Sequence, residues 1–177
     1  MTIQERYEWA CSTESDIREL IPILRKYGEQ CSHITEFGTN RGVSTSAWLA
    51  AKPKHLVCYD VGRYPSVDEI AFLANSNDVG FRFIREDTAY AIIEPTELLF
   101  IDTVHHANHL RLELMGNHLN VKKLLIFHDT EIYGLNGEGG APGMWTAILQ
   151  LLTEHNAIWR ILEVRPESNG LTVLQRI

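Results

Sequence analysis

A short strand, a glycine turn and the start of a helix follow one another between residues 34 and 49, and this stretch constrains the fold most. It reads Ile-Thr-Glu-Phe-Gly-Thr-Asn-Arg-Gly-Val-Ser-Thr-Ser-Ala-Trp-Leu. The pattern predicts a strand over 34–37, a turn over 38–42 and a helix after it. In α/β folds, a strand that ends in a tight glycine turn brings backbone close to a nucleotide-like ligand. The sequence therefore predicts an α/β fold with a ligand at this turn.

The spacing of the glycines argues against two common phosphate-binding loops. Gly38 and Gly42 are four apart, and the middle glycine of the dinucleotide fingerprint G-x-G-x-x-G would fall on Asn40. A P-loop would continue with Lys and Ser or Thr after its last glycine, but here Val-Ser follows. Glu36, just before the turn, would repel a pyrophosphate and attract a cation. A positively charged nucleoside fits better, and S-adenosylmethionine carries a sulfonium and an ammonium group.

Short apolar runs alternate with helix-length segments along the rest of the chain. Further strands are expected at Leu56–Tyr59, Phe81–Ile84, Leu98–Ile101 and Lys123–Phe127, and helical spacing covers residues 43–51, 66–76, 106–119 and 143–155. A capped amphipathic helix is expected to begin at residues 12–15 and to end near Gly28. Residues 157–165 and 171–177 predict two strands joined by a turn at Asn169-Gly170. We expect a Rossmann-like, doubly wound, mostly parallel seven-stranded sheet with a C-terminal antiparallel hairpin.

Length and charge limit the class of protein. The 177 residues suit one domain, 1–177, with a helical segment over residues 1–30 packed on it. The formal net charge is −7 and no run of Lys or Arg is present, so nucleic acid is not an expected partner. The expected partner is a small-molecule acceptor, and homo-oligomerisation is left open.

The cysteines and apolar runs indicate the compartment. Cys11, Cys31 and Cys58 are odd in number and widely spaced, which argues against a disulfide framework or a zinc knuckle and favours a reducing environment. The N-terminus lacks the apolar core of a signal peptide, and no apolar run approaches the ~20 residues that a membrane span requires. We expect a cytoplasmic protein with no membrane partner.

Acidic residues stand where the second and third expected strands end. Asp60 lies at about the distance from the turn at which nucleoside-binding sheets place an acid on the ribose hydroxyls. A strand-end Asp that caps the next turn explains it equally well. Asp87 could accept from an adenine amino group, although a helix N-cap formed with Thr88 is an interpretation at least as good.

Asp102, His128 and Asp129 end the fourth and fifth strands, which lie side by side in a doubly wound sheet. Two carboxylates and an imidazole at one edge predict a divalent-cation site, with ordinary helix-capping residues as the alternative. His105 lies on the turn after Asp102 and could take a proton from a substrate hydroxyl. A metal pair of His105 with His109 is a weak interpretation, because no third ligand stands at a familiar spacing.

Three segments together resemble the class I S-adenosylmethionine-dependent methyltransferases: Glu36-Phe-Gly-Thr-Asn-Arg-Gly-Val-Ser44, Leu99-Phe-Ile-Asp-Thr-Val-His105 and Ile126-Phe-His-Asp-Thr130. The chain is most similar to small, stand-alone members such as the cephalosporin-hydroxylase-like and macrocin O-methyltransferase groups. The resemblance covers about residues 30 to 177. It implies a cofactor site in which Asp60 holds the ribose and Asp87 lies near the adenine. The methionine part would be surrounded by Glu36, Gly38, Asn40, Gly42 and Ser44, and Thr39 and Asp102 are also expected to bind the cofactor.

The resemblance also implies a metal site and a base. Asp102, His128 and Asp129 occupy the positions that hold Mg²⁺ in metal-dependent members, and His105 stands where a basic side chain acts as general base in catechol O-methyltransferases. His128 replaces an expected oxygen ligand, which favours a softer ion such as Mn²⁺ or Zn²⁺. Val104 replaces a second acid that related chains often carry.

The function expected from the sequence is methylation of a hydroxyl on a small acceptor, either a sugar or a catechol-like ring, assisted by Mg²⁺ or Mn²⁺. Asp102 and His105 would be the catalytic residues, and the glycine-rich loop 134–143 would close over the acceptor, with Trp145 at its exit. Two alternatives stay open. One is a metal-independent methyltransferase that uses His105 as the base, and the other is a catalytically silent cofactor-binding module. Asn40 makes a nicotinamide dehydrogenase a poor fit.

Overall fold

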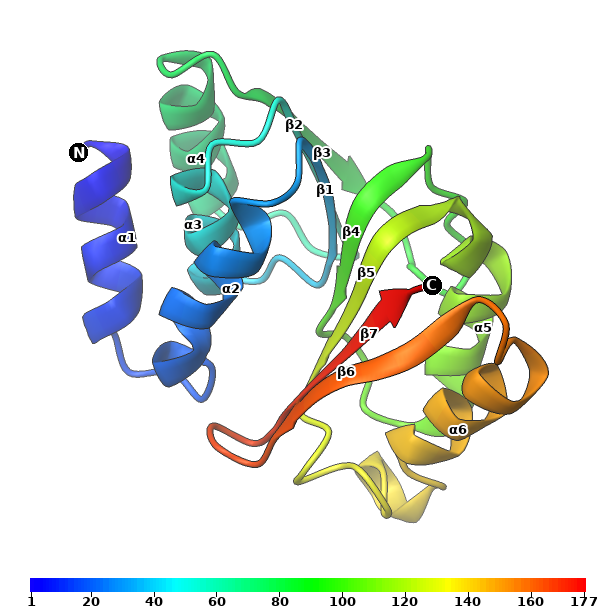
Figure 1. The fold of residues 1–177 in the computed structure, drawn as a ribbon. Coiled ribbons are helices and arrows are strands. Elements are labelled where there is room, and N and C mark those ends of the chain that lie inside the picture. The colour runs from blue at the N-terminus through cyan, green and yellow to red at the C-terminus, as the bar shows by residue number, and fades with distance from the viewer.

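One seven-stranded sheet organises the molecule. The computed structural model describes all 177 residues, and its strands are ordered β3-β2-β1-β4-β5-β7-β6 (Figure 1). Strands β1 to β5 are parallel, whereas β7 is antiparallel to both β5 and β6. The predicted doubly wound sheet with a C-terminal hairpin is therefore confirmed. The strands are β1 His33–Phe37, β2 His55–Asp60, β3 Gly80–Arg85, β4 Thr96–Ile101, β5 Val121–His128, β6 Trp159–Arg165 and β7 Leu171–Arg176.

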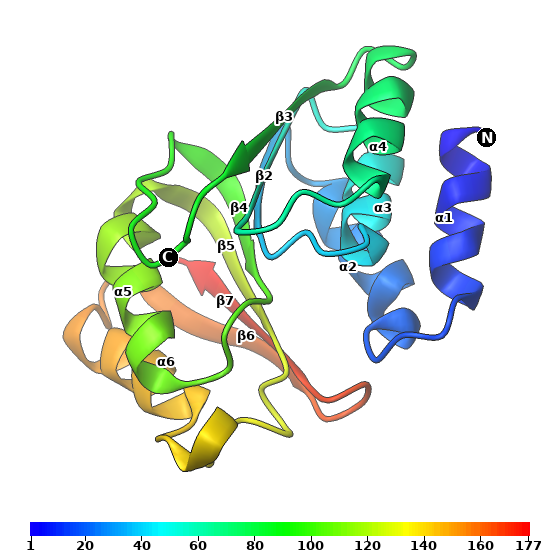
Figure 2. The same cartoon turned by 180° about the vertical axis from the view of Figure 1, so that it is seen from behind.

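Helices cover both faces of the sheet. Helices α1 to α4 lie on one face, and α5 and α6 lie on the other (Figures 1 and 2). The longest helices, α5 and α6, have 11 residues each, and none of the helices combines the length and apolarity needed to cross a membrane. The helices are α1 Ile3–Ser12, α2 Ile21–Gly28, α3 Val43–Ala50, α4 Ser66–Asn75, α5 Ala107–Asn117 and α6 Met144–Glu154.

The central strands are buried on both sides, as a parallel sheet between two helical layers requires. Successive side chains of a strand point to opposite faces. In β4, Leu98 and Phe100 therefore join the core under α1 to α4, while Leu99 and Ile101 join the core under α5 and α6. Strands β1 and β4 pair in parallel from Ile34 and Leu98 to Phe37 and Ile101, so their carboxyl ends lie side by side.

The N-terminal segment differs from the expectation in one respect. Residues 12–15 do not begin a long helix, because α1 ends at Ser12; the N-terminus of α1 carries a capping box between Thr2 and Glu5. A 3₁₀ turn over Arg18–Leu20 precedes α2, which has Pro22 in its first turn. A proline fits there because the first-turn amides need no partner within the helix, whereas further inside it would break the ladder. Residues 13–17 therefore connect α1 with the next helical turn beside the carboxyl edge of the sheet.

Candidate functional site

Two adjoining cavities lie at the carboxyl edge of the sheet, where β1 stands between β2 and β4. The chain leaves β1 toward β2 on one side, while β4 lies on the other, and such switch points are where doubly wound sheets bind ligands. The cavities measure about 300 and 270 Å³. Both are lined by Gly38, Asn40, Asp102 and Thr103. The glycine turn and the end of β4 thus form the ridge on which the two spaces meet.

The glycine turn adopts the left-handed conformation at three positions. Gly38, Asn40 and Gly42 have φ angles of +87°, +43° and +75°. A Cβ on Gly38 would overlap the backbone carbonyl of Asp102, so the turn can approach β4 this closely only with glycine. The amide of Gly38 donates to the carbonyl of Tyr59 at 2.9 Å, which joins the turn to β2.

Asp60 holds the first half of the turn. One of its carboxylate oxygens accepts from the amides of Thr39 (2.9 Å) and Asn40 (2.8 Å), and the other accepts from the amide of Gly62 (2.8 Å). The same carboxylate lines the second cavity. A carboxylate has about four acceptor sites, so one remains for a ligand. The two interpretations of Asp60, a turn cap and a ribose acceptor, are therefore compatible.

The structure gives Glu36 a different place from the one expected. Its side chain is fully buried beneath the turn and lines neither cavity. The carboxyl oxygens accept hydrogen bonds from Ser44 Oγ (2.7 Å), Thr45 Oγ1 (2.5 Å), Trp48 Nε1 (3.0 Å) and Cys58 Sγ (3.2 Å). The expectation that Glu36 attracts a cationic ligand directly is therefore corrected: it fastens the start of α3 to β1 and β2.

The burial of Glu36 predicts a pH-dependent stability. Burial raises its pKa from 4.5 to about 7, although the four hydrogen bonds oppose the rise. A carboxyl whose pKa is higher in the folded state stabilises most below its unfolded pKa, and this contribution is lost as the pH rises through the folded pKa. Between pH 4.5 and 7, the unfolding free energy of the wild type should fall by roughly 3 kcal/mol more than that of Glu36→Gln. Each unit of pKa difference contributes about 1.36 kcal/mol. Urea titrations across this range check it; identical slopes in the two proteins would contradict it.

The second cavity brings together the residues expected around a nucleoside. Asp60 and Asp87 both line it, together with Tyr64. One oxygen of Asp87 accepts from the amide of Ala89 at 3.0 Å, so Asp87 also caps a turn. Gly42 lines neither cavity, and its role is to let the chain enter α3.

A buried glutamate beside this cavity was missed by the sequence analysis. Glu113, on α5, accepts through Oε1 from Thr88 (2.5 Å) and Thr103 (2.8 Å) and lies 3.2 Å from His109 Nε2. Thr88, Thr103 and His109 line the second cavity. The only sequence signal for Glu113 is its spacing from His109: residues four apart on a helix lie on the same face.

The cluster expected to hold a cation is assembled. Asp102, His128 and Asp129 offer ligand atoms that all lie within 4.8 Å of one another. The side chain of Asp129 is 4% exposed, and Asp129 has a φ of +61° that turns its carboxylate toward β4. The parallel pairing of β4 with β5 brings these strand ends together, as the sequence predicted.

His128 meets a structural test for a metal ligand. Its Nε2 lies 2.9 Å from the carbonyl oxygen of Ser168, which can only accept, so Nε2 carries the hydrogen. Its buried Nδ1 lies 3.5 Å from Asp102 and 3.4 Å from Asp129 without a hydrogen bond to either, and Asp129 Oδ1 is also buried without a partner. Neutral Nδ1 would direct a lone pair at two carboxylates, so a proton or a cation must stand between them. The donor set of one nitrogen and two carboxylates fits a divalent ion.

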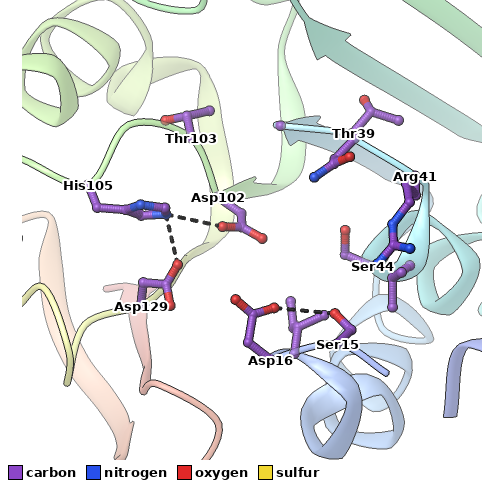
Figure 3. Close-up of a pocket in the computed structure, with 13 residues that line it drawn as sticks. Ser15, Asp16, Thr39, Arg41, Ser44, Asp102, Thr103, His105 and Asp129 are labelled. Atoms are coloured by element: carbon purple, nitrogen blue, oxygen red, sulfur yellow. Dashed lines mark hydrogen bonds and ion pairs between the residues drawn. The ribbon is translucent and has the colours of Figure 1, made fainter. Parts of the chain in front are cut away.

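His105 lies against the same carboxylates. Its Nε2 is 2.8 Å from Asp129 and 3.5 Å from Asp102 (Figure 3), and its Nδ1 is 2.7 Å from Glu138. Burial alone would lower the histidine pKa, but these three carboxylates raise the pKa of His105 to about 11. In the same way, burial opposes but Asp102 and Asp129 raise the pKa of His128 to about 10. The cluster is therefore an acidic centre that attracts positive charge.

The glycine-rich loop is fastened to His105. Tyr133 stacks on the imidazole with ring centroids 4.8 Å apart, and Glu138 both contacts Nδ1 and donates its amide to the His105 carbonyl. Trp145 donates Nε1 to the carbonyl of Thr130 at 3.0 Å, which holds the base of the loop. The roles of Tyr133 and Glu138 were missed, since nothing in the loop sequence shows that it reaches His105.

The wall opposite the cluster comes from the N-terminal segment and the turn. Asp16 and Ser15 lie across the first cavity from Asp102 and Asp129, and Arg41 flanks it beside Ser44 (Figure 3). The connection between α1 and α2 carries no motif that would have identified this wall.

No protein-family model matches the chain, and no curated protein matches it by sequence. Solved structures do match. An S-adenosylhomocysteine-bound methyltransferase, PaMTH1 of Podospora anserina, has 17% identity and a TM-score of 0.65 over 99% of this chain and 87% of that one.

Two further structures match over similar lengths. The N-methyltransferase NodS of Bradyrhizobium japonicum has 17% identity and a TM-score of 0.62 over 91% of this chain and 96% of its own. A 1,6-didemethyltoxoflavin-N1-methyltransferase of Burkholderia thailandensis, with bound S-adenosylhomocysteine, has 16% identity and a TM-score of 0.62 over 93% and 79%. At these identities the likeness concerns the fold. The chain has the Rossmann-like fold of class I S-adenosylmethionine-dependent methyltransferases.

Proposed function

We propose that this protein transfers the methyl group of S-adenosylmethionine to a hydroxyl of a small acceptor, with a divalent cation bound at the end of β4 and β5. The observation that carries the proposal is the pair of cavities that meet at Gly38 and Asp102. One cavity has acceptors suited to a nucleoside, and the other has the acidic cluster. A ligand that joins a nucleoside to a cationic amino-acid tail matches this division.

The second cavity would take the adenosine. Asp60 keeps acceptor capacity for ribose hydroxyls after it has bound the turn amides, and Asp87 lies on the same wall. The solved structures with bound S-adenosylhomocysteine show that proteins of this fold bind such ligands.

The first cavity would take the methionine part and the acceptor. Ser44 and Arg41 line it on one side, and Asp102 lines it on the other. A guanidinium and a carboxylate on opposite walls suit a zwitterionic amino-acid group. The carboxylate of Asp102 is also well placed to favour a nearby sulfonium. These side chains would orient the donor methyl toward an acceptor above Asp129, and such positioning is a large part of catalysis.

Asp102, His128 and Asp129 would hold the cation, because each offers a ligand atom within 4.8 Å of the others. His128 Nδ1 and Asp129 Oδ1 are also buried without a hydrogen-bond partner. A bound divalent ion would lower the pKa of the acceptor hydroxyl and orient it.

His105 is the proposed base, and its surroundings favour the cation-assisted version. Facing three carboxylates, the imidazole is kept protonated and has no lone pair with which to accept a proton. Positive charge on Asp102 and Asp129 would weaken this stabilisation and release His105 for proton transfer. In the metal-independent alternative, no cation would weaken this stabilisation, and His105 would stay protonated.

Methyl transfer from labelled S-adenosylmethionine tests the proposal. A panel of hexoses, polyols and catechols should include an acceptor that is methylated with Mn²⁺ or Mg²⁺ and not after chelation. Activity that survives the chelator would select the metal-independent alternative. Cofactor binding without turnover across the panel would favour a silent binding module.

A further inference from the structure

A buried arginine on the N-terminal helix reaches the glycine turn from outside the site. Arg6, on α1, is 5% exposed. Its Nη2 donates to the carbonyl of Arg41 at 3.0 Å, its Nε donates to Ser46 Oγ at 3.1 Å, and its Nη1 lies 2.5 Å from Glu69. Its guanidinium carbon lies 4.2 Å from the ring centroid of Trp9. The guanidinium therefore joins α1 to the turn, to α3 and to α4.

Two of these contacts lead to the second half of the turn. The carbonyl of Arg41 accepts directly, and Ser46, which accepts from Arg6, donates its own Oγ to the carbonyl of Gly42 at 2.6 Å. Ile70 and Arg6 also fill the space beside Gly42, where an added Cβ would lie 2.5 and 3.3 Å from them. The guanidinium thus fixes the last two residues of the turn.

The turn depends on such contacts because glycine leaves its backbone many alternative conformations. Gly38, Asn40 and Gly42 are all left-handed, a region that glycine enters freely and asparagine tolerates, so contacts from other elements must select this conformation. Asp60 holds the amides of residues 39 and 40. Arg6 acts directly on the carbonyl of residue 41 and, through Ser46, on that of residue 42, so the two charged side chains hold opposite halves of one loop.

We propose that Arg6 is a positioning residue for S-adenosylmethionine binding: it holds the glycine turn in its binding conformation through the carbonyls of Arg41 and Gly42. The proposal rests on the proposed function, but Arg6 lines neither cavity and touches no ligand. The N-terminal helix then contributes to cofactor affinity as well as to packing. A purely structural Arg6 would affect stability alone.

Calorimetric titration with S-adenosylhomocysteine separates these roles. We expect Arg6→Met to weaken binding by about 10-fold or more, because a charge-assisted hydrogen bond to the turn is lost. Glu69→Gln removes the ion-pair partner and leaves the turn contacts intact, so its affinity should stay within about 2-fold of the wild type. Arg25→Met is the matched control: Arg25 also stacks on an aromatic ring of α1, that of Tyr7, and pairs with Glu29, but contacts no part of the turn.

Thermal unfolding of each variant shows how much stability it has lost. If Arg6→Met binds S-adenosylhomocysteine as tightly as the wild type does, the proposal is wrong, however unstable the variant is. If Arg6→Met does not fold, Ser46→Ala replaces it, and a loss of about 3-fold or more is expected from the broken link to Gly42. Unchanged affinity in Ser46→Ala would then overturn the proposal.

Amide exchange gives a readout that needs no ligand. The amides of Thr39, Asn40 and Gly42 should exchange faster in Arg6→Lys than in the wild type, because an ammonium cannot reproduce the forked contacts. Amides of α2 should not change. If wild-type protein fails to bind S-adenosylhomocysteine, the proposed function is wrong, and faster exchange at the turn still shows that Arg6 positions it. Unchanged exchange contradicts the role of Arg6 in either case.

Discussion

Replacing Gly38 by alanine is expected to abolish S-adenosylmethionine binding. The new Cβ would overlap the carbonyl of Asp102, and the φ of +87° is strained for any residue with a side chain. The turn must then move away from β4, which separates the two cavities at the ridge where they meet. We expect a loss of affinity of at least about 100-fold, and a loss of stability above the roughly 1–2 kcal/mol of a left-handed alanine. Calorimetry and urea unfolding measure both.

Gly139 provides the matched control for this change. It is also left-handed, with a φ of +64°, but no atom lies within 4 Å of an added Cβ. Gly139→Ala should therefore cost only the conformational strain and leave cofactor affinity unchanged. If Gly38→Ala and Gly139→Ala behaved alike, the close approach of the turn to Asp102 would not matter for binding.

Asp129→Asn is expected to remove cation binding with little change in shape. Asparagine tolerates the left-handed φ of +61° at this position, so the backbone can stay in place. The variant loses the charge that faces His105 Nε2 at 2.8 Å and His128 Nδ1 at 3.4 Å. Replacing residues that only orient metal ligands costs 10–100-fold in affinity, so losing a ligand should cost about 100-fold or more in Mn²⁺ binding. Electron paramagnetic resonance of free Mn²⁺ measures it.

Glu131→Gln is the control, because Glu131 is an exposed acid two residues further along the chain. It should bind Mn²⁺ as the wild type does. Methyl transfer that depends on the cation should fall with Mn²⁺ affinity in Asp129→Asn and persist in Glu131→Gln. Equal Mn²⁺ affinity in Asp129→Asn and the wild type would exclude Asp129 as a ligand.

The fold could be predicted because its signals are local. Strands β1, β2, β4 and β5 contain short apolar runs, and the four helices expected between residues 43 and 155 all appear within two residues of their predicted ends. The N-terminal segment was harder, because Pro22 and residues 12–17 divide it in a way that helical periodicity does not show.

The site was predictable only as far as strand order determines it. Parallel strands bring their carboxyl ends to one edge, so Asp60, Asp102 and Asp129 could be grouped from the sequence. The burial of Glu36 was not readable, since a strand-end acid can face either a cavity or the core. Arg6 and Glu138 reach the site through tertiary contacts 35 and 33 residues away in sequence, and no local pattern encodes those distances.

Calorimetric titration of the wild-type protein with S-adenosylmethionine tests the central claim most directly. We expect saturable binding at one site per chain, with a dissociation constant within the range of about 1 μM to 1 mM that enzymes show for their substrates. Gly38→Ala, titrated in parallel, should give no binding heat. An absence of binding to folded wild-type protein at millimolar S-adenosylmethionine would contradict the account.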